Sequence, residues 1–512
     1  MLRPRLSHIL RGKLLLERDP CNPALAEEAF QTALEIAKQQ GARSWGLRAS
    51  FSLAKLYQST DRSVEAHAIL AHALEGFSPT PEMPEIAEAQ ALLATFAETT
   101  EVKAAIAQRQ RRLDLQTSYA QAVLWSKGWA ADETKAAFER VGDVATRAEF
   151  PAERFPALYG QAIWSLVRGD VREARAISQR FLDEAEAEGR IADAAVARHE
   201  LGFACLCLGD LAEARSQLEL ALDGHDRERD RNVREKYGED FGVSSRTILA
   251  HASWMLGELG RARQLIEEAI RIGDERHHLP STSQALGFKM VFEAFRKDYQ
   301  RVIADADNLL TISERHNMGS HVGWAGIYLN WAQAMMGGDA TAGAAGLCKS
   351  LAALTSRNHR LGTPFFLGLR AELEFAAEEH VCALALIDEA LALAQKSGEQ
   401  YTDAHLHRLR GDILLKHDPA KPALAEEAFQ AAAAVAKQQG SRSFGLRAAL
   451  SLARLYQSTA RTADAHAVLA PALEGLTPTP EMPEIAEAQA LLESLPHSGE
   501  GAIASKDQAT KG

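Results

Sequence analysis

Small residues recur at fixed intervals along this chain, and they restrict it to one kind of packing. In one stretch, Gly202, Gly209, Ala214 and Ala221 stand at relative positions 8, 15, 20 and 27, with Leu218 at position 24. Helix axes approach to about 8 Å only where the facing side chains are small. A glycine at position 15 also suits the tight turn that follows a helix. The spacing therefore predicts two antiparallel helices joined by a short turn.

The same spacing returns through most of the sequence. Its position 20 falls at residues 26, 66, 174, 214, 262, near 302, near 343, and at 383, 425 and 465, mostly in steps of 40 to 42 residues. This is the pattern of a tetratricopeptide repeat, a unit that packs only on its neighbours. We therefore predict an all-α fold in which tetratricopeptide-like helix-turn-helix repeats stack in a right-handed superhelical solenoid. The longer step after residue 214 holds the mixed-charge segment Asp223–Gly242, which predicts a solvated helix extension or loop.

One module occurs twice. Gly12–Leu93 and Gly411–Leu492 align without a gap at an offset of 399, and 59 of the 82 positions are identical. Each copy ends in a Pro- and Glu-rich helix start, as expected of a capping helix. The predicted organisation is an N-terminal module (1–97), a helical linker (98–112), a central array (113–402), a C-terminal module with a capping helix (403–497) and a disordered tail (498–512).

Charge and cysteine content narrow the class of protein. The formal net charge of −12 argues against a nucleic-acid binder, which would present a basic face. No stretch of about 18 apolar residues occurs, so no membrane insertion is expected. The five cysteines form no C-x-x-C pair, which predicts buried thiols in a reducing compartment and a cytoplasmic location. They are Cys21, Cys205, Cys207, Cys348 and Cys382.

No catalytic constellation emerges from the sequence. His199-Glu200 is not followed by the second histidine of an H-E-x-x-H zinc motif. The glycine-rich text Gly337–Ser350 lacks the Gly-Lys-Ser/Thr of a phosphate-binding loop. We therefore predict a protein that is not an enzyme and that uses neither a cofactor nor a metal ion.

The concave face of such a superhelix is lined by the first helix of each pair. In the central array this placement predicts a groove rich in aromatic, His and Met side chains, suited to an apolar helix or an extended peptide. The alternative is that several of these side chains are core contacts between repeats. The candidate partner-binding residues are Tyr159, Ile163, Leu166, His199, Phe203, His251, Trp254, Met255, Tyr328, Met335 and Met336.

The terminal modules offer a small basic set instead. Arg447 and Arg454 of the C-terminal copy correspond to Arg48 and Lys55 of the N-terminal copy. Guanidinium groups bind carboxylates in a bidentate geometry, so these side chains are candidates for binding an acidic group of a partner. Surface ion pairing is the alternative.

Several stretches resemble the C-terminal repeat region of a bacterial family that joins a class III adenylate/guanylate cyclase domain to an AAA-type, STAND-like ATPase. They are Phe429–Leu476, "SKGWAADETKAAFERV" (Ser126–Val141), Lys236–Ala262 and "DAHLHRLRGDILL" (Asp403–Leu415). The resemblance covers about Leu113–Leu495, and again Arg11–Leu93. It implies a tetratricopeptide array, but the strand-rich cyclase domain and the phosphate loop of the ATPase have no counterpart here, so no catalytic residue is carried over.

Three functional hypotheses follow. The first is an interaction scaffold that binds a partner protein or peptide through its concave face. The second is a regulatory or sensor subunit that acts in trans on a cyclase/ATPase signalling protein, as the resemblance implies. The third is a passive relic of such a multidomain protein. Self-association is compatible with each of them.

Overall fold

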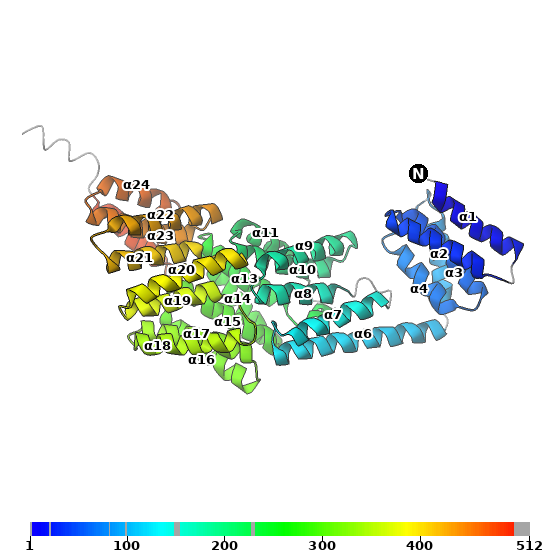
Figure 1. Cartoon of the computed structure of the whole chain (residues 1–512), viewed down its shortest axis with the longest axis horizontal. Coiled ribbons are helices and arrows are strands. Elements are labelled where there is room, and N and C mark those ends of the chain that lie inside the picture. Colours follow the sequence, from blue (N-terminus) through cyan, green and yellow to red (C-terminus); the bar gives the residue numbers. More distant parts are fainter. Residues whose placement is uncertain are drawn as a thin grey trace, which may run out of the picture. The chain divides into compact units, whose positions relative to one another are not determined.

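The structure is a computed structural model that describes residues 3–19, 22–80, 82–97, 100–147, 154–226 and 231–495. The described residues form 25 helices and two isolated antiparallel bridges, Thr80 with Met83 and Thr479 with Met482 (Figure 1). The predicted fold class, all-α with paired helical repeats, is confirmed. The predicted disordered tail (498–512) and Cys21 lie outside the described residues.

The helices follow one another with short connections and pack chiefly as successive antiparallel pairs. In chain order they are α1 (Arg3–Arg18), α2 (Ala24–Gln39), α3 (Arg43–Ser59), α4 (Ser63–Leu74), α5 (Glu85–Ala97), α6 (Thr100–Lys127), α7 (Asp132–Arg147), α8 (Phe155–Val167), α9 (Val171–Ala187), α10 (Ile191–Leu208), α11 (Leu211–Asp223), α12 (Arg231–Tyr237), α13 (Phe241–Met255), α14 (Leu259–Arg276), α15 (Leu279–Arg296), α16 (Tyr299–Arg315), α17 (Gly319–Met335), α18 (Ala340–Thr355), α19 (Thr363–Ala376), α20 (His380–Ser397), α21 (Asp403–His417), α22 (Pro422–Gln439), α23 (Arg442–Ser458), α24 (Thr462–Leu473) and α25 (Glu484–Ser494).

The chain divides into two compact units. The first comprises residues 1–120, 137–157 and 184–190, and the second comprises residues 121–136, 158–183 and 191–512. The first unit holds the N-terminal copy of the module. The second holds most of the central repeats and the C-terminal copy.

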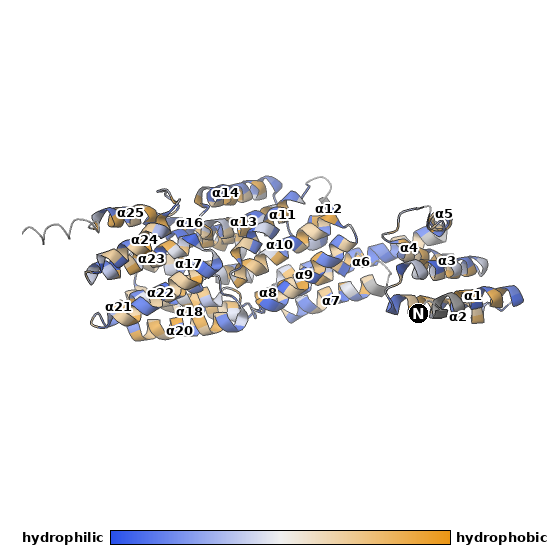
Figure 2. Cartoon of the chain, turned by 90° about the horizontal axis from the view of Figure 1, so that it is seen from above, coloured by the Kyte–Doolittle hydropathy of each residue, from blue (hydrophilic) through white to orange (hydrophobic). Residues whose placement is uncertain are grey.

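The small residues of the repeat frame lie where the helices touch. Ala174, Ala214, Ala262 and Ala383 are fully buried, as the spacing predicts. Gly12 and Gly411 show how close the approach is, because a methyl group at either position would lie 2.4 Å from the ring of Phe30 or Phe429. Most helices carry hydrophobic and hydrophilic residues side by side (Figure 2), as expected of helices that bury one face in a stack.

Within the second unit, later repeats bond back to earlier ones. The backbone amides of Arg360 and Leu361 donate to the carbonyl of Val167 at 2.8 and 3.0 Å. The amides of Gln400 and Tyr401 donate to the carbonyl of Cys207 at 2.8 and 3.2 Å. The loops that precede α19 and α21 are thus attached to the last turns of α8 and α10, and we call these four hydrogen bonds the closing contacts.

The next pair of repeats meets in a related way. The hydroxyl of Ser441 donates to the carbonyl of Met255 at 3.3 Å, and the hydroxyl of Ser443 donates to the carbonyl of Trp254. The N-terminal end of α23 therefore lies against the C-terminal end of α13. Local repeat spacing gives no sign of such contacts, because they join residues 186 to 194 positions apart, as Ser441 and Met255 or Leu361 and Val167 do. The concave groove that the repeat pattern predicts is therefore crossed by the loops before α19 and α21 of the same unit.

The mixed-charge segment Asp223–Gly242 differs from its prediction. Its last part forms α12, and Tyr237, Glu239 and Asp240 are buried. The hydroxyl of Tyr237 donates to Asp193 Oδ1 at 2.5 Å, and Lys236 Nζ lies 2.9 Å from the same oxygen. The prediction of a solvated segment is wrong for these residues because their polar groups are bonded to partners on neighbouring helices.

Candidate functional site

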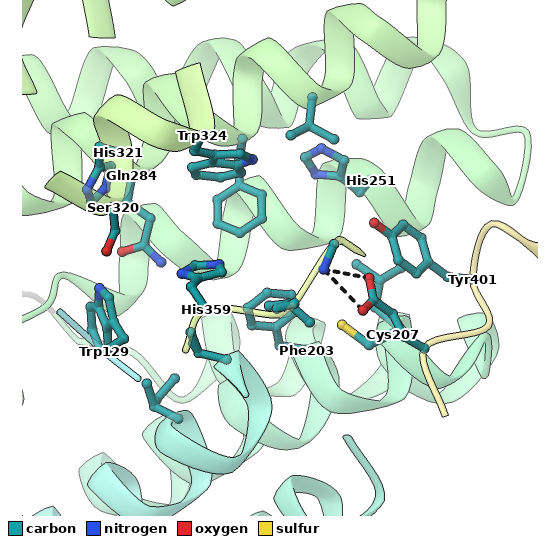
Figure 3. Close-up of a pocket in the computed structure, with 18 of the residues that line it drawn as sticks. Trp129, Phe203, Cys207, His251, Gln284, Ser320, His321, Trp324, His359 and Tyr401 are labelled. Atoms are coloured by element: carbon teal, nitrogen blue, oxygen red, sulfur yellow. Dashed lines mark hydrogen bonds between the residues drawn. The ribbon is translucent and has the colours of Figure 1, made fainter. Parts of the chain in front are cut away.

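Within the second unit lies a cavity of about 140 Å³, which we call the chamber (Figure 3). Its walls come from the first helices of successive pairs, α8, α10, α13, α15, α17 and α19, and from the loops before α7, α13, α19 and α21. The lining residues that Figure 3 labels are Trp129, Phe203, Cys207, His251, Gln284, Ser320, His321, Trp324, His359 and Tyr401.

Aromatic side chains form a continuous wall of the chamber. The rings of Phe203 and Phe288 pack edge to face with their centroids 5.7 Å apart. Phe288 packs in the same manner on Trp324 at 5.3 Å and on His251 at 5.6 Å. Because each ring fixes the orientation of the next, the wall is shaped before any ligand arrives.

Four histidines line the chamber, and burial lowers the pKa of each below the usual value of 6.5. The pKa falls to about 3 for His199 and to about 4 for His251, His321 and His359. Two of the rings are fixed by hydrogen bonds, His199 Nδ1 with Ser245 Oγ at 2.9 Å and His251 Nδ1 with the carbonyl of Thr247 at 2.7 Å. All four rings are therefore neutral at physiological pH.

Two glutamates of the lining have raised pKa values, so that at pH 7 Glu399 is largely protonated and Glu239 is about half protonated. Burial raises the pKa of Glu239 to about 7, although its hydrogen bonds, including the one that Tyr159 Oη donates at 3.1 Å, lower it. Burial raises the pKa of Glu399 to about 8, opposed by the backbone amide of Gly362, which donates to both carboxyl oxygens at 2.8 and 3.1 Å (Figure 3). Near neutral pH the four histidines are neutral, Glu399 is mostly neutral and Glu239 is partly ionised, so the charge of the chamber is low, which suits an uncharged ligand group.

Some polar atoms in this lining have no partner. Gln284 Oε1 and His359 Nδ1 are buried and make no hydrogen bond within the part of the chain that the structure describes. An unpartnered buried polar atom costs about 1–3 kcal/mol. A ligand that brings a hydrogen-bonding group to either atom would recover part of that cost.

The chamber lacks the features of a metal site. Among the described residues, no group of three or more His, Cys, Asp or Glu side chains is arranged to hold a metal ion. The thiol of Cys207 in the lining is buried, and this burial raises its pKa well above 9.0. None of the described helices is long and apolar enough to cross a membrane.

The predicted groove residues fall into three groups. Ile163, His199, Phe203, His251 and Tyr328 line the chamber together. Tyr159, Leu166, Trp254 and Met255 are buried against neighbouring repeats and are closed to a partner in this arrangement, in agreement with the alternative that they are core contacts. Met335 and Met336, at the end of α17, do not line the chamber.

The two predicted arginines are also separated. Arg447 is buried, with Nη2 2.7 Å from Glu484 Oε1 and 2.7 Å from the carbonyl of Phe295. Its bonding capacity is therefore used inside the fold rather than offered to a partner. Arg454 is half exposed and forms an ion pair with Glu487, as the alternative of surface ion pairing supposes.

Sequence reasoning missed several lining residues. Glu239 and Glu399 stand in loops between helices, and Trp129, Gln284 and His359 belong to units whose repeat pattern is degenerate. Their only signal is a polar or aromatic residue close to a helix start. That signal is too common along the chain to select these lining residues, because the closing contacts that bring them together cannot be read from it.

Comparison with known proteins gives limited information. No family model matches the chain. An uncharacterized protein of Rhizobium meliloti (strain 1021) is 25% identical over 249 residues, which are 48% of this chain and 24% of that protein. The chain thus spans about a quarter of the length of that curated relative.

Solved structures were compared as well. Yeast Tom70 aligns over 99% of both chains at 13% identity with a TM-score of 0.30. Cut9 in the APC/C hetero-tetramer Cut9-Hcn1 aligns over 97% of both chains at 11% identity with a TM-score of 0.39. A STAND protein with a tetratricopeptide repeat sensor from Pyrococcus horikoshii aligns over 97% of this chain and 73% of its own at 12% identity, with a TM-score of 0.36. At these scores the function has to be argued from the site itself.

Proposed function

We propose that this chain is a non-enzymatic binding protein whose partner polypeptide places one uncharged aromatic or aliphatic side chain in the chamber. The observation that supports the proposal is the chamber itself, with its aromatic wall, its neutral histidines and two glutamates whose pKa values burial raises. A cavity of about 140 Å³ is close to the roughly 150 Å³ that admits a benzene molecule. The closing contacts favour such a single anchor over a helix or peptide lying along an open groove.

A second candidate function is the sensing of a small neutral molecule. The closing contacts favour it, because the loops around the chamber can surround a free ligand more completely than a side chain that remains attached to its polypeptide. In that case the chain would fit the hypothesis of a sensor that acts in trans on a cyclase/ATPase signalling protein. Both candidates share one ligand chemistry, an uncharged group the size of a single ring.

The first test measures thermal stabilisation by neutral and charged ring compounds. We expect toluene and indole to raise the melting temperature by binding the folded state, and benzoate to have a smaller effect. Val291→Phe should fill the chamber and remove the response. Val381→Phe makes the same change on an exposed surface and should keep it. An equal response in both variants would place the binding elsewhere.

The second test separates the two sources of the ligand group. Peptides selected by display against the full chain should carry a Phe, Leu or Ile anchor and lose binding to Val291→Phe but not to Val381→Phe. Selection of no such peptide, with ring compounds still bound, would favour the small-molecule candidate. If neither probe binds the wild-type chain, the chamber is only a packing defect and the proposal fails.

A further inference from the structure

The two copies of the module differ in what covers them. In the C-terminal copy, α23 and the loop before α25 lie on a surface formed by the ends of α13 and α15 and the first turns of α14, which we call the array face. Its residues are Trp254, Met255, Arg263, Phe295 and Arg296. The rings of Trp254 and Phe295 both pack edge to face on Phe444, at 5.6 and 6.0 Å.

Polar contacts complete this attachment. Glu481 lies 3.0 Å from Arg263 Nη2 and 2.8 Å from Arg296 Nε, and its carbonyl accepts a hydrogen bond from Trp254 Nε1 at 3.3 Å. Arg296 Nη2 also donates to the carbonyl of Pro480 at 3.0 Å. The array face therefore recognises an aromatic residue at one end of the module and a glutamate at the other.

The N-terminal copy carries the same recognition residues. Ser44, Arg48 and Glu82 stand where Ser443, Arg447 and Glu481 stand in the other copy, and Pro79–Leu93 is identical to Pro478–Leu492. Two relevant contact positions differ. Trp45 replaces Phe444, which keeps an aromatic ring, and Ala42 replaces Ser441, which removes one hydrogen bond.

These residues are open in the N-terminal copy. Ser44 and Glu82 are exposed and Trp45 is half-buried, whereas Ser443 and Phe444 are buried. The N-terminal counterparts of the residues that contact the array face are therefore exposed or half-buried.

The N-terminal copy has a groove at the position where the C-terminal copy receives the end of α15. It has a volume of about 540 Å³ and is lined by α1, α3 and the start of α5, including Trp45, Arg48 and Glu85. In the C-terminal copy the corresponding position holds the end of α15, where Arg447 binds the carbonyl of Phe295. Burial together with Arg408 lowers the pKa of the adjacent Lys297.

We propose that the N-terminal module of one chain docks on the array face of a second copy of the same chain, in the place that the C-terminal module of that copy otherwise occupies. The docked state would pair Glu82 with the second copy's Arg263 and Arg296, and Trp45 with its Trp254 and Phe295. The C-terminal module belongs to the same chain as the array face that it covers, so its effective concentration at that face is high. Exchange is therefore favoured by a raised protein concentration or by a weakened C-terminal contact.

The test uses full-length chains and sedimentation velocity. Glu481→Arg places a third cation beside Arg263 and Arg296 and should release the C-terminal module. We expect the apparent dimerisation constant of this variant to tighten by about tenfold or more, because the vacated face then accepts the N-terminal module of another copy. Adding Glu82→Arg should return the chain to the monomer, and Glu82→Arg alone should leave wild-type behaviour unchanged.

Two results would overturn the proposal. One is a folded Glu481→Arg variant, checked by circular dichroism, that stays monomeric at every concentration. The other is association that persists in the Glu481→Arg/Glu82→Arg chain, which would assign it to a different surface.

A second measurement needs no disruption of the C-terminal module. A photoreactive benzoylphenylalanine in place of Trp45 is introduced into light chains, which are mixed with isotopically heavy wild-type chains. Light-to-heavy crosslinks from position 45 to residues 251–256 or 292–297 are expected. Their absence at high concentration, or crosslinks to other residues only, would contradict docking on the array face.

Discussion

Arg48 and Arg447 occupy the same place in two nearly identical modules, yet their environments differ. The Arg48 side chain is 38% exposed and pairs with Glu85 at 3.0 Å. The Arg447 side chain is 5% exposed, pairs with Glu484 at 2.7 Å, lies over the ring of Trp254 and binds the carbonyl of Phe295. Burial lowers the pKa of Arg447 below its usual value.

The comparison shows that the module does not define its own surface. One sequence supplies a solvent-facing ion pair in one copy and a buried, hydrogen-bonded charge in the other. The neighbour decides which, since the C-terminal copy packs on the ends of α13 and α15. Matched substitutions in the two copies can therefore measure what the neighbour contributes.

The largest difference is expected for the arginines. Arg447→Ala leaves the partly buried Glu484 without its ion-pair partner and removes the bond to the carbonyl of Phe295, so the second unit should lose about 3 kcal/mol of stability. Arg48→Ala breaks an exposed pair and should cost about 0–1 kcal/mol. Hydrogen exchange of α3 and α23 in the two full-length variants measures both. Equal losses would mean that Arg447 is not buried in solution.

The glycines of the first helix in each module should behave alike. Gly12→Ala and Gly411→Ala both push a methyl group into a phenylalanine ring of the same module. Because this contact lies inside the module and not at its neighbour, each change should cost about 1–3 kcal/mol. Local exchange protection in α2 and α22 reports each loss. A marked inequality would show that the two modules do not share one internal packing.

The protonation of Glu399 in the chamber makes the stability of the second unit depend on pH. Its pKa of about 8 lies above the usual 4.5, so the folded state retains a proton that the unfolded state has released. Stability from this group is therefore present below about pH 4.5 and is lost as the pH rises towards about 8. The lowered pKa values of the four chamber histidines act in the opposite sense, since they add stability as the pH rises from about 4 to 6.5.

Glu399→Gln keeps an oxygen that can accept from Gly362 but cannot ionise. At pH 8.5 this variant should be more stable than the wild type by roughly 1–2 kcal/mol, whereas near pH 5 the two should be similar. Thermal unfolding across this range measures the effect, and exchange in the N-terminal module, which has no part in the chamber, is the internal reference. A constant difference at all pH values would assign the effect to packing.

The smallest difference concerns the serines. Ser443 donates a buried hydrogen bond to the carbonyl of Trp254, whereas Ser44 is exposed. Ser443→Ala should cost about 1 kcal/mol, and Ser44→Ala should stay within about 0.5 kcal/mol of the wild type. Denaturant unfolding of both variants gives the two values. A cost at Ser44 equal to that at Ser443 would show that this residue too is covered in solution, as docking on a second copy would produce at high concentration.

The sequence predicted what depends on local spacing. Ala214 and Ala262 mark helix contacts because a small side chain is needed wherever two axes approach, and the structure buries both. The sequence could not predict the chamber. Whether His251 lines a cavity while Trp254, one turn later, belongs to the array face depends on segments more than 100 residues away. The charges of Glu239 and Glu399 depend in turn on that enclosure.

The closing contacts also bear on how such a chain can change in length. An open stack of repeats tolerates the gain or loss of a unit, since each unit touches only its neighbours. Here the carbonyls of Val167 and Cys207 must meet amides about five repeats further on, so an inserted unit would put those partners out of register. The number of repeats between the partners of the closing contacts is therefore fixed. A duplicated module can be accommodated outside this segment but not within it.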